Sequence, residues 1–186
     1  MPNYVYNTIY CKKELLPYIM KDGGISFSIL IPPPTSAAEC LEKYGEEYLD
    51  GEDENGNSIR SLCHTESNKW FNWYDWNRNF WGTKWDALEG DCYLKDNLYL
   101  ITFSTAWAPP TPWIEKLAEI GEPFIHHWLE EQGYGACHSY NGNETQQINY
   151  GIEDAYKYDP ETGEETEVDE GFPSPTEIRE FFSETS

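Results

Sequence analysis

The sequence predicts an α+β domain in which helices pack on an antiparallel sheet, followed by an acidic extension. Strand-like runs alternate with helix-like segments over the first 130 residues, and a hairpin pattern follows them. Aromatic residues make up 16% of the chain, which is enough to build a sizeable core. The length of 186 residues is typical of one domain with an appendage. We therefore expect one domain over residues 1–152 and an extension over residues 153–186.

The first three predicted elements lie before a run of prolines. Residues 4–10 are rich in β-branched and aromatic side chains, which predicts a strand, and residues 12–20 predict a short helix. Residues 25–31 (ISFSILI) alternate large apolar side chains with serines, which predicts a second strand. That strand should end at Pro32, because proline cannot donate to a sheet ladder.

The next predicted helix is strongly acidic. Thr35 or Ser36 can cap a helix that runs to about residue 49, and a glycine-containing loop follows it. Residues 39–54 hold eight acids and one base, a net charge of −7. We expect the acidic side of the helix and the loop to be exposed.

Residues 69–87, KWFNWYDWNRNFWGTKWDA, are the most distinctive segment. Helical spacing places four aromatic side chains on one face: Trp70, Trp73, Tyr74 and Trp81. We expect an amphipathic helix that ends near Gly82 and whose aromatic stripe fills the core. The alternative is a ligand-stacking platform in a cleft. The polar residues that would line such a cleft are Asp75, Asn77, Arg78 and Lys84.

The remaining elements of the domain follow in close order. Residues 98–105 are apolar on both faces, which predicts a central strand. Thr111 suits the N-cap of a helix that runs to about residue 120. Residues 124–130 predict another strand, and residues 137–140 and 146–152 predict a hairpin.

The C-terminal extension is acidic throughout. From Glu153 to the end there are twelve acids and two bases, a net charge of −10. Residues 159–171 contain few apolar side chains, which predicts a disordered or mobile loop. Residues 175–182 have apolar side chains at helical spacing, which predicts a short terminal helix that docks on the domain.

Three motifs resemble those of a known family. They are the opening MPNYVYN, the central WYDWNRNFWGTKWDA and the later FSTAWAPPTPW. In this combination and order they resemble the YubB-like family, uncharacterised proteins with a ferredoxin-like domain encoded by phages, plasmids and prophages. Tyr4 stands where that family usually has Trp. The resemblance implies a ferredoxin-like fold and a mobile-element origin, and it implies no reaction.

The charge restricts the possible partners. The chain has 34 acids and 12 bases, a formal net charge of −22. Phosphate backbones bind clustered Lys and Arg, so we expect no direct contact with nucleic acid, whereas a basic protein is a natural partner. The five cysteines form no CxxC pair, the N-terminus lacks a signal pattern, and no apolar run reaches the length of a membrane span. We therefore expect a cytoplasmic protein without a membrane segment.

Sequence motifs for catalysis are missing. The chain has no GxSxG, GxxxxGK or HExxH motif, and we predict that it is not an enzyme and has no cofactor. Cys63-His64 and Cys137-His138 could together supply four zinc ligands. Adjacent ligands are unusual in structural zinc sites, so we predict no metal site. His126 and His127 lie in one predicted strand, where they point to opposite faces and are expected to be structural.

The acidic segments carry the main functional hypothesis. We predict an anti-defence protein of a phage or mobile element, an anti-CRISPR or anti-restriction inhibitor acting in the cytoplasm of a bacterial host. It would mimic DNA and bind a CRISPR effector or another basic defence nuclease. The expected contact residues are Glu46, Glu47, Asp50, Glu52, Asp53, Glu54, Asp159, Glu161, Glu164, Glu165, Glu167, Asp169 and Glu170. The alternative is a small-ligand or nucleotide-binding domain that uses the aromatic segment.

Overall fold

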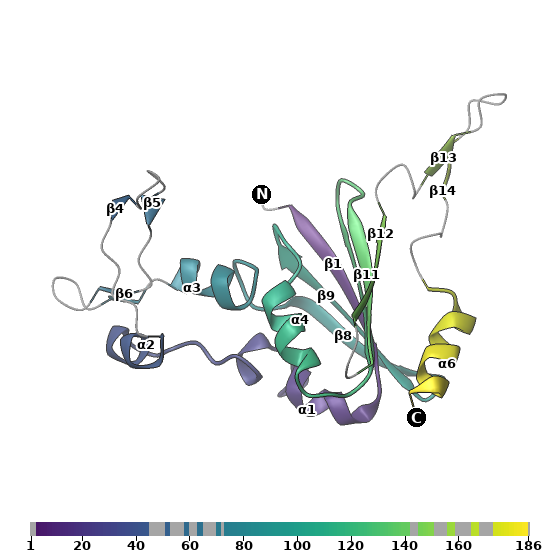
Figure 1. Ribbon diagram of the computed structural model, residues 1–186, viewed down its shortest axis with the longest axis horizontal. Helices are drawn as coiled ribbons and strands as arrows, with labels where there is room; N and C mark the ends of the chain where they lie inside the picture. The colour runs from purple at the N-terminus through teal and green to yellow at the C-terminus, as the bar shows by residue number, and fades with distance from the viewer. Residues whose placement is uncertain are drawn as a thin grey trace.

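An antiparallel sheet organises the chain (Figure 1). The computed structural model describes residues 3–44, 51–52, 58–59, 63–64, 70–71, 73–141, 145–150, 156–158, 165–167 and 173–185. Within these residues the main sheet has six strands in the order β12-β11-β10-β1-β9-β8. They are β1 (Tyr4–Cys11), β8 (Leu88–Lys95), β9 (Leu98–Ala106), β10 (Phe124–Glu130), β11 (Gly135–Tyr140) and β12 (Thr145–Tyr150).

Four short hairpins accompany the main sheet in the described part of the chain. They pair β2 (Met20–Lys21) with β3 (Gly24–Ile25), β4 (Gly51–Glu52) with β5 (Ser58–Ile59), β6 (Cys63–His64) with β7 (Trp70–Phe71), and β13 (Tyr156–Tyr158) with β14 (Glu165–Glu167). The last of these lies within the acidic extension, and residues 159–164 and 168–171 of the predicted mobile loop lie outside the described residues.

Helices cover both faces of the main sheet. They are α1 (Leu16–Ile19), α2 (Ala37–Tyr44), α3 (Trp73–Phe80), α4 (Thr111–Ala118) and α6 (Pro175–Glu184), with single 3₁₀ turns η1 (Lys13–Leu15) and η2 (Phe27–Ile29). In Figure 1, α1 and α4 lie on one side of the sheet and α6 lies on the other. None of the described helices combines the length and apolar character needed to cross a membrane.

Strand β1 lies inside the sheet and shows why the two faces differ. Its residues Val5, Asn7, Ile9 and Cys11 alternate with less buried ones, and all four are at most 1% exposed. The buried residues face the first core, because alternate side chains of a strand point to the same face. Ile9 pairs with Ile101 of β9 on one side and with His126 of β10 on the other. On the opposite face Tyr6 is 53% exposed.

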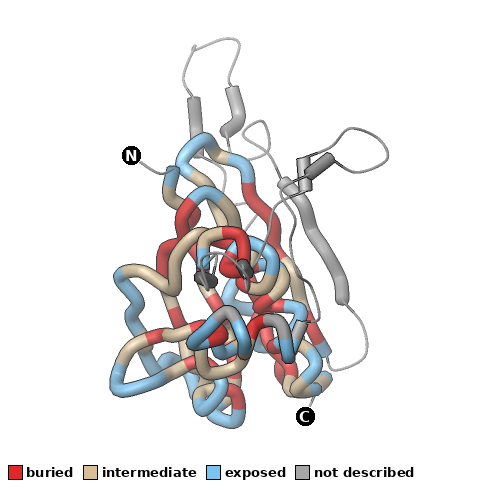
Figure 2. The backbone as a smooth tube through the Cα atoms, turned by 90° about the vertical axis from the view of Figure 1, so that its left-hand side faces the viewer, coloured by how far each residue is buried: buried red, intermediate tan, exposed pale blue. Residues whose placement is uncertain are grey.

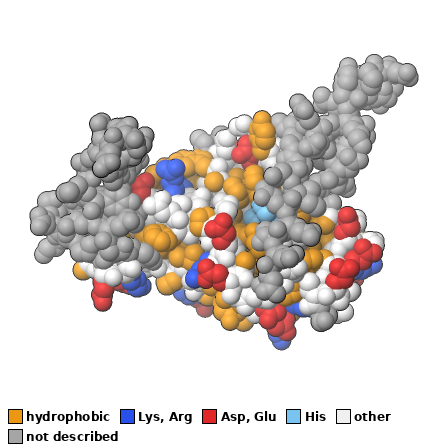
Figure 3. All heavy atoms as spheres, in the orientation of Figure 1, with side chains coloured by type: hydrophobic (Ala, Val, Ile, Leu, Met, Phe, Trp, Pro, Cys, Tyr) orange, Lys and Arg blue, Asp and Glu red, His pale blue; other side chains and the backbone are white. Residues whose placement is uncertain are grey.

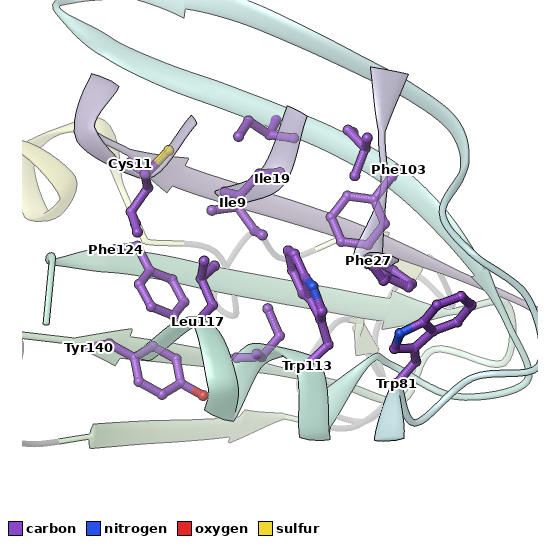
Figure 4. Close-up of a cluster of buried hydrophobic side chains, with 14 of the residues drawn as sticks. Ile9, Cys11, Ile19, Phe27, Trp81, Phe103, Trp113, Leu117, Phe124 and Tyr140 are labelled. Carbon is purple, nitrogen blue, oxygen red and sulfur yellow. The ribbon is translucent and has the colours of Figure 1, made fainter. Parts of the chain in front are cut away.

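The first core combines aromatic and aliphatic side chains, and α1 and α4 contribute to it (Figure 4). Figure 2 shows the buried positions along the backbone in red. Phe27 contacts Trp113 of α4 at 4.8 Å between ring centroids and Phe103 of β9 at 5.7 Å. Phe124 and Tyr140 stack at 4.4 Å. Full burial of one such large side chain stabilises the fold by about 1.5 to 3 kcal/mol, so this cluster is a major source of stability.

The terminal helix α6 covers part of the second face, as predicted. Ile178 and Phe182 pack against Ile125 and Cys137 of the sheet. Ser174 and Glu177 form a reciprocal capping box, in which each side chain accepts a hydrogen bond from the other residue's backbone N–H. This cap explains why the helix begins directly after Ser174.

The strand predicted at residues 25–31 is wrong. Only Gly24–Ile25 forms a strand, and after the extended Ser26 the chain forms the 3₁₀ turn η2. The cause is Asp86, whose carboxylate accepts hydrogen bonds from Phe27 N at 2.6 Å and from Ser26 Oγ at 2.7 Å. These bonds replace ladder hydrogen bonds and direct Phe27 into the core.

The other predicted elements are confirmed with altered ends. The strands at residues 4–10, 98–105 and 124–130 and the hairpin correspond to β1, β9, β10, β11 and β12. The helix predicted from Thr35 or Ser36 is α2, and its extension beyond Tyr44 lies outside the described residues. The prediction that Thr111 is the N-cap of the next helix is wrong, because Thr111 is the first residue of α4 and Pro110 is its N-cap.

His126 and His127 are buried on opposite faces of β10. His126 pairs with Ile9, whose side chain belongs to the first core, and His127 pairs with Cys137, which belongs to the second. Burial lowers the pKa of His127 to about 4. It is also the main reason why the pKa of His126 falls to about 3, with smaller contributions from His138 and His127. Both imidazoles are therefore neutral near pH 7.

His127 should make folding sensitive to pH. Its folded pKa, about 4, is below the unfolded value of 6.5, so its contribution to stability is complete above pH 6.5 and is lost as pH falls toward 4. Between pH 6 and 4.5 we expect the free energy of unfolding to fall more steeply in the wild type than in His127→Gln, by about 1.4 kcal/mol per pH unit. Urea denaturation of both proteins across this pH range measures the difference. Both proteins have the same carboxylates, so the contribution of the carboxylates to the two pH slopes cancels in the comparison. Equal pH slopes would contradict the prediction.

Candidate functional site

Two of the distinctive sequence motifs meet in space and form a pocket. The turn after α3, residues 81–85, lies against the segment after β9, residues 106–108. Between them is a cavity of about 360 Å³. It is lined by Asp75, Arg78, Asn79, Gly82, Thr83, Lys84, Ala106, Trp107 and Ala108.

Hydrogen bonds hold the turn in place. Thr83 Oγ1 donates to Ala106 O at 2.9 Å and accepts from Ala106 N at 3.1 Å. Asn77 is buried behind the pocket, and its Nδ2 donates to Lys84 O at 2.8 Å. The position of Lys84 is therefore set by α3 and β9 together.

Trp107 has a strained backbone at the pocket rim. Its φ angle is 72°, in the left-handed region that a bulky aromatic residue rarely adopts. Neighbouring bonds maintain this conformation, because Trp107 N donates to Asn3 O at 2.9 Å and Thr105 Oγ1 donates to Ala108 O at 2.8 Å. The side chain is 44% exposed. Such strain costs about 1 to 3 kcal/mol and is concentrated at functional sites.

Two cations lie among aromatic rings in this pocket. Lys84 Nζ is 4.4 Å from the ring centroid of Trp85, 4.7 Å from that of Trp107 and 5.8 Å from that of Tyr74. The guanidinium carbon of Arg78 is 5.5 Å from the Tyr74 centroid. Neither cation forms an ion pair with a described residue, whereas Lys43, Lys116 and Arg179 each pair with a carboxylate. The pocket thus contains two cations that form no ion pair within the described part of the chain, together with the carboxylate of Asp75, on a chain of net charge −22.

The prediction that the aromatic stripe fills the core is confirmed for Trp81 and wrong for Trp73. Trp76 and Trp81 enter the first core, while Trp73 is 48% exposed and Tyr74 is half-buried. Trp76 is held there by Phe80, at 5.1 Å between ring centroids, and by Trp81, at 5.4 Å. The side chain of Trp70 lies outside the described residues.

The polar residues of the alternative hypothesis do come together. Asp75, Arg78 and Lys84 line the pocket, and Asn77 supports it from behind. Sequence reasoning missed Thr83 and Trp107. Their signal was available, because both lie inside the two motifs quoted for the family resemblance. Nothing in the spacing of those motifs indicated that they would meet.

The acidic contact residues of the main hypothesis fall mostly beyond the described part of the chain. Those outside it are Glu46, Glu47, Asp50, Asp53, Glu54, Asp159, Glu161, Glu164, Asp169 and Glu170. Glu52 lies in β4, and Glu165 and Glu167 lie in β14, where the backbone is described and the side chains are not.

Cysteine and histidine do not form a metal centre in the described residues. No group of three or more His, Cys, Asp or Glu there could hold a metal ion. Cys137 and His138 lie in β11, and the side chains of Cys63 and His64 in β6 are outside the described part. Burial is the main cause that raises the pKa of Cys137 to about 11, so this thiol is protonated near pH 7.

The comparison with known families agrees with this architecture. Residues 80–170 match the family described as the ferredoxin-like domain in Api92-like protein. The chain therefore carries a ferredoxin-like α+β domain, and the match includes β8 to β12 and the pocket residues from Gly82 to Ala108. No curated protein and no solved structure matches the chain.

Gly82 should be required for the shape of the pocket. Its φ is 85°, and an added Cβ would lie 2.5 Å from Pro112 Cδ and 3.0 Å from Thr111 N. Gly121 is the matched control, because it has the same φ and no atom within 4 Å of an added Cβ. We expect Gly121→Ala to cost about 1 kcal/mol through backbone strain alone and Gly82→Ala to cost at least about 1 kcal/mol more. Urea denaturation measures both, and equal losses would contradict the close approach.

Proposed function

We propose that the chain is a binding protein for a small anionic ligand with a planar ring, of the nucleotide class. The pocket between α3 and β9 is the proposed site. The observation that carries this proposal is the placement of two cations that form no ion pair with a described residue: Arg78 lies beside the ring of Tyr74, and Lys84 lies beside the exposed ring of Trp107. A cation next to an exposed aromatic face can pair with a phosphate while the ring stacks on the attached base.

The overall charge does not exclude this ligand. Electrostatic interactions in water are screened beyond about 10 Å at 0.1 M salt, so nearby cations outweigh distant carboxylates. Lys84 is also held in place by three rings before any ligand arrives. This preorganisation reduces the entropy lost on binding.

Fragments of one nucleotide test the two parts of the proposal. Adenosine 5′-monophosphate should raise the melting temperature in a thermal-shift assay at 0.15 M salt, because it can use both the cations and the rings. Adenosine lacks the anion and ribose 5-phosphate lacks the ring, so each should stabilise less at equal concentration. Absence of stabilisation by adenosine 5′-monophosphate and 5′-triphosphate would reject the nucleotide class.

Trp107→Asn should separate binding from stability. Asparagine adopts the left-handed conformation more readily than tryptophan, so the loss of ring contacts is partly offset by relief of strain. We expect the free energy of unfolding to change by less than about 1 kcal/mol, while the affinity for adenosine 5′-monophosphate falls at least about tenfold through lost stacking. Calorimetric titration and urea denaturation measure the two quantities. Retained affinity in this variant would contradict the placement of the ligand on Trp107.

The cations can be tested against a matched surface lysine. Lys84→Met and Arg78→Gln should each weaken binding of the same nucleotide by about tenfold or more, since each removes a charged hydrogen bond. Lys13→Gln is the control, because Lys13 follows the end of β1 that is remote from Ala106. If all three variants bind equally well, the cations do not contact the ligand.

A second proposal rests on the charge of the chain. Two acidic segments, residues 39–54 and 153–186, have net charges of −7 and −10 and supply most of the total of −22. We propose that they bind a basic host protein, and that the chain is an anti-defence inhibitor from a phage or mobile element related to the YubB-like family. Its place of action would be the bacterial cytoplasm, on a CRISPR effector or restriction nuclease.

This interaction should depend on salt and on the named acids. The wild type should inhibit a purified target nuclease at low salt and lose affinity as salt rises, because interface charges are screened. Neutralising Glu46, Glu47, Asp50, Glu52, Asp53 and Glu54 to Gln or Asn should weaken binding. Neutralising an equal number of acids elsewhere, including Glu119 and Glu131, is the control. Equal effects of the two sets would reject the acidic contact surface.

A further inference from the structure

A second cavity lies on the face of the sheet that α4 covers, between α4 and the strands β10 and β11. Its volume is about 340 Å³. It is lined by Thr111, Ile114, Glu115, His126, Trp128, His138 and Tyr140. In the space-filling view an imidazole is visible beside hydrophobic side chains near the middle of the molecule (Figure 3). We propose that this cavity binds a small organic ammonium ion, independently of the nucleotide pocket.

The hydrogen-bond pattern determines which nitrogen of His126 carries its proton. Thr105 Oγ1 gives its only hydrogen to Ala108 O, so at 3.0 Å it accepts from Asn7 Nδ2. Asn7 Nδ2 also donates to Val5 O at 3.0 Å. Asn7 Oδ1 must therefore face His126 Nε2, 3.1 Å away, and accept its hydrogen. In a neutral imidazole this arrangement leaves Nδ1 of His126 as a hydrogen-bond acceptor.

His126 remains an acceptor at physiological pH. The side chain is 2% exposed, and burial keeps its pKa near 3, so the ring is not protonated near pH 7. Nδ1 of His126 has no hydrogen-bond partner among the described residues. An ammonium group carries only donors, which complements a buried acceptor of this kind.

The charge of the cavity also favours a cation. Among the described residues, its lining includes the carboxylate of Glu115 and no Lys or Arg. Lys116, the nearest cation along α4, pairs with Glu119. The carboxylate of Glu115 can therefore pair with a ligand. Burial is the main cause that raises the pKa of Tyr140 to about 12, and the negative charge of Glu115 is a second, smaller cause. Glu115 is therefore close enough to act on the phenol of Tyr140, which lines the same cavity. An anion would meet this carboxylate without a compensating cation.

Aromatic side chains complete the site. Trp128 and Tyr140 line the cavity, and Tyr140 is held by stacking on Phe124 at 4.4 Å. An ammonium ion near aromatic faces gains about 0.5 to 2 kcal/mol from the ring quadrupoles. Carboxylate, imidazole acceptor and aromatic faces together define a site for a ring-bearing or short-chain amine.

Benzylammonium is the probe, and benzyl alcohol is its neutral counterpart of similar shape. In calorimetric titrations of the full chain at pH 7 we expect benzylammonium to bind at least about fivefold more tightly than benzyl alcohol. Glu115→Gln should weaken benzylammonium binding by about fivefold, and Glu180→Gln, an exposed acid on α6 at the other side of the sheet, should leave it unchanged. Chemical shifts of the His126 ring nitrogens should report a protonated Nε2 and a perturbation of Nδ1 on binding.

The outcomes separate this site from the nucleotide pocket. Trp107→Asn and Lys84→Met should bind benzylammonium as the wild type does, whatever they do to nucleotide binding. Absence of benzylammonium binding, equal affinity for benzyl alcohol, or equal effects of Glu115→Gln and Glu180→Gln would each overturn the proposal. An Nδ1-protonated His126 would do so as well, because the acceptor would then be missing.

Discussion

The structure depends on one buried hydrogen-bond chain, which runs from His126 through Asn7 and Thr105 to Ala108. It crosses the three inner strands β10, β1 and β9. Burying a donor or acceptor without a partner costs free energy, so each bond formed along this series offsets part of the cost of burying its polar groups. This series of hydrogen bonds therefore defines the register of the three inner strands and also stabilises them.

The proposed nucleotide pocket and the proposed ammonium cavity lie at opposite ends of this series of hydrogen bonds. At one end Ala108 follows Trp107, whose left-handed backbone presents an exposed ring beside Lys84. At the other end the orientation of Asn7 leaves His126 as an acceptor in the cavity under α4. The two proposed ligand classes differ because the side chains around each end differ in charge, with two cations and the carboxylate of Asp75 at the first site and the carboxylate of Glu115 at the second.

The chain separates its charge from its core. The acidic residues concentrate in two segments, while the first core is built from large apolar and aromatic side chains. Repulsion at a net charge of −22 opposes compaction, and burial of aromatic surface offsets it. This separation underlies the two proposals, ligand binding within the domain and electrostatic contact through the acidic segments.

The sequence by itself determined the α+β class, most strands of the sheet and the terminal helix, because alternation and helical spacing depend on the local chain. Tertiary structure decided the exceptions. Residues 25–31 alternate like a strand, yet Asp86, some sixty positions away, removes them from the sheet. Spacing grouped Trp73 with Trp81, but packing of Trp76 against Phe80 turned Trp73 outward.

The polar residues of the nucleotide pocket were named from the sequence, whereas Trp107 and Thr83 joined them only through the approach of β9 to the turn after α3. Local patterns specify which elements form, and long-range hydrogen bonds and packing specify which side chains share a cavity.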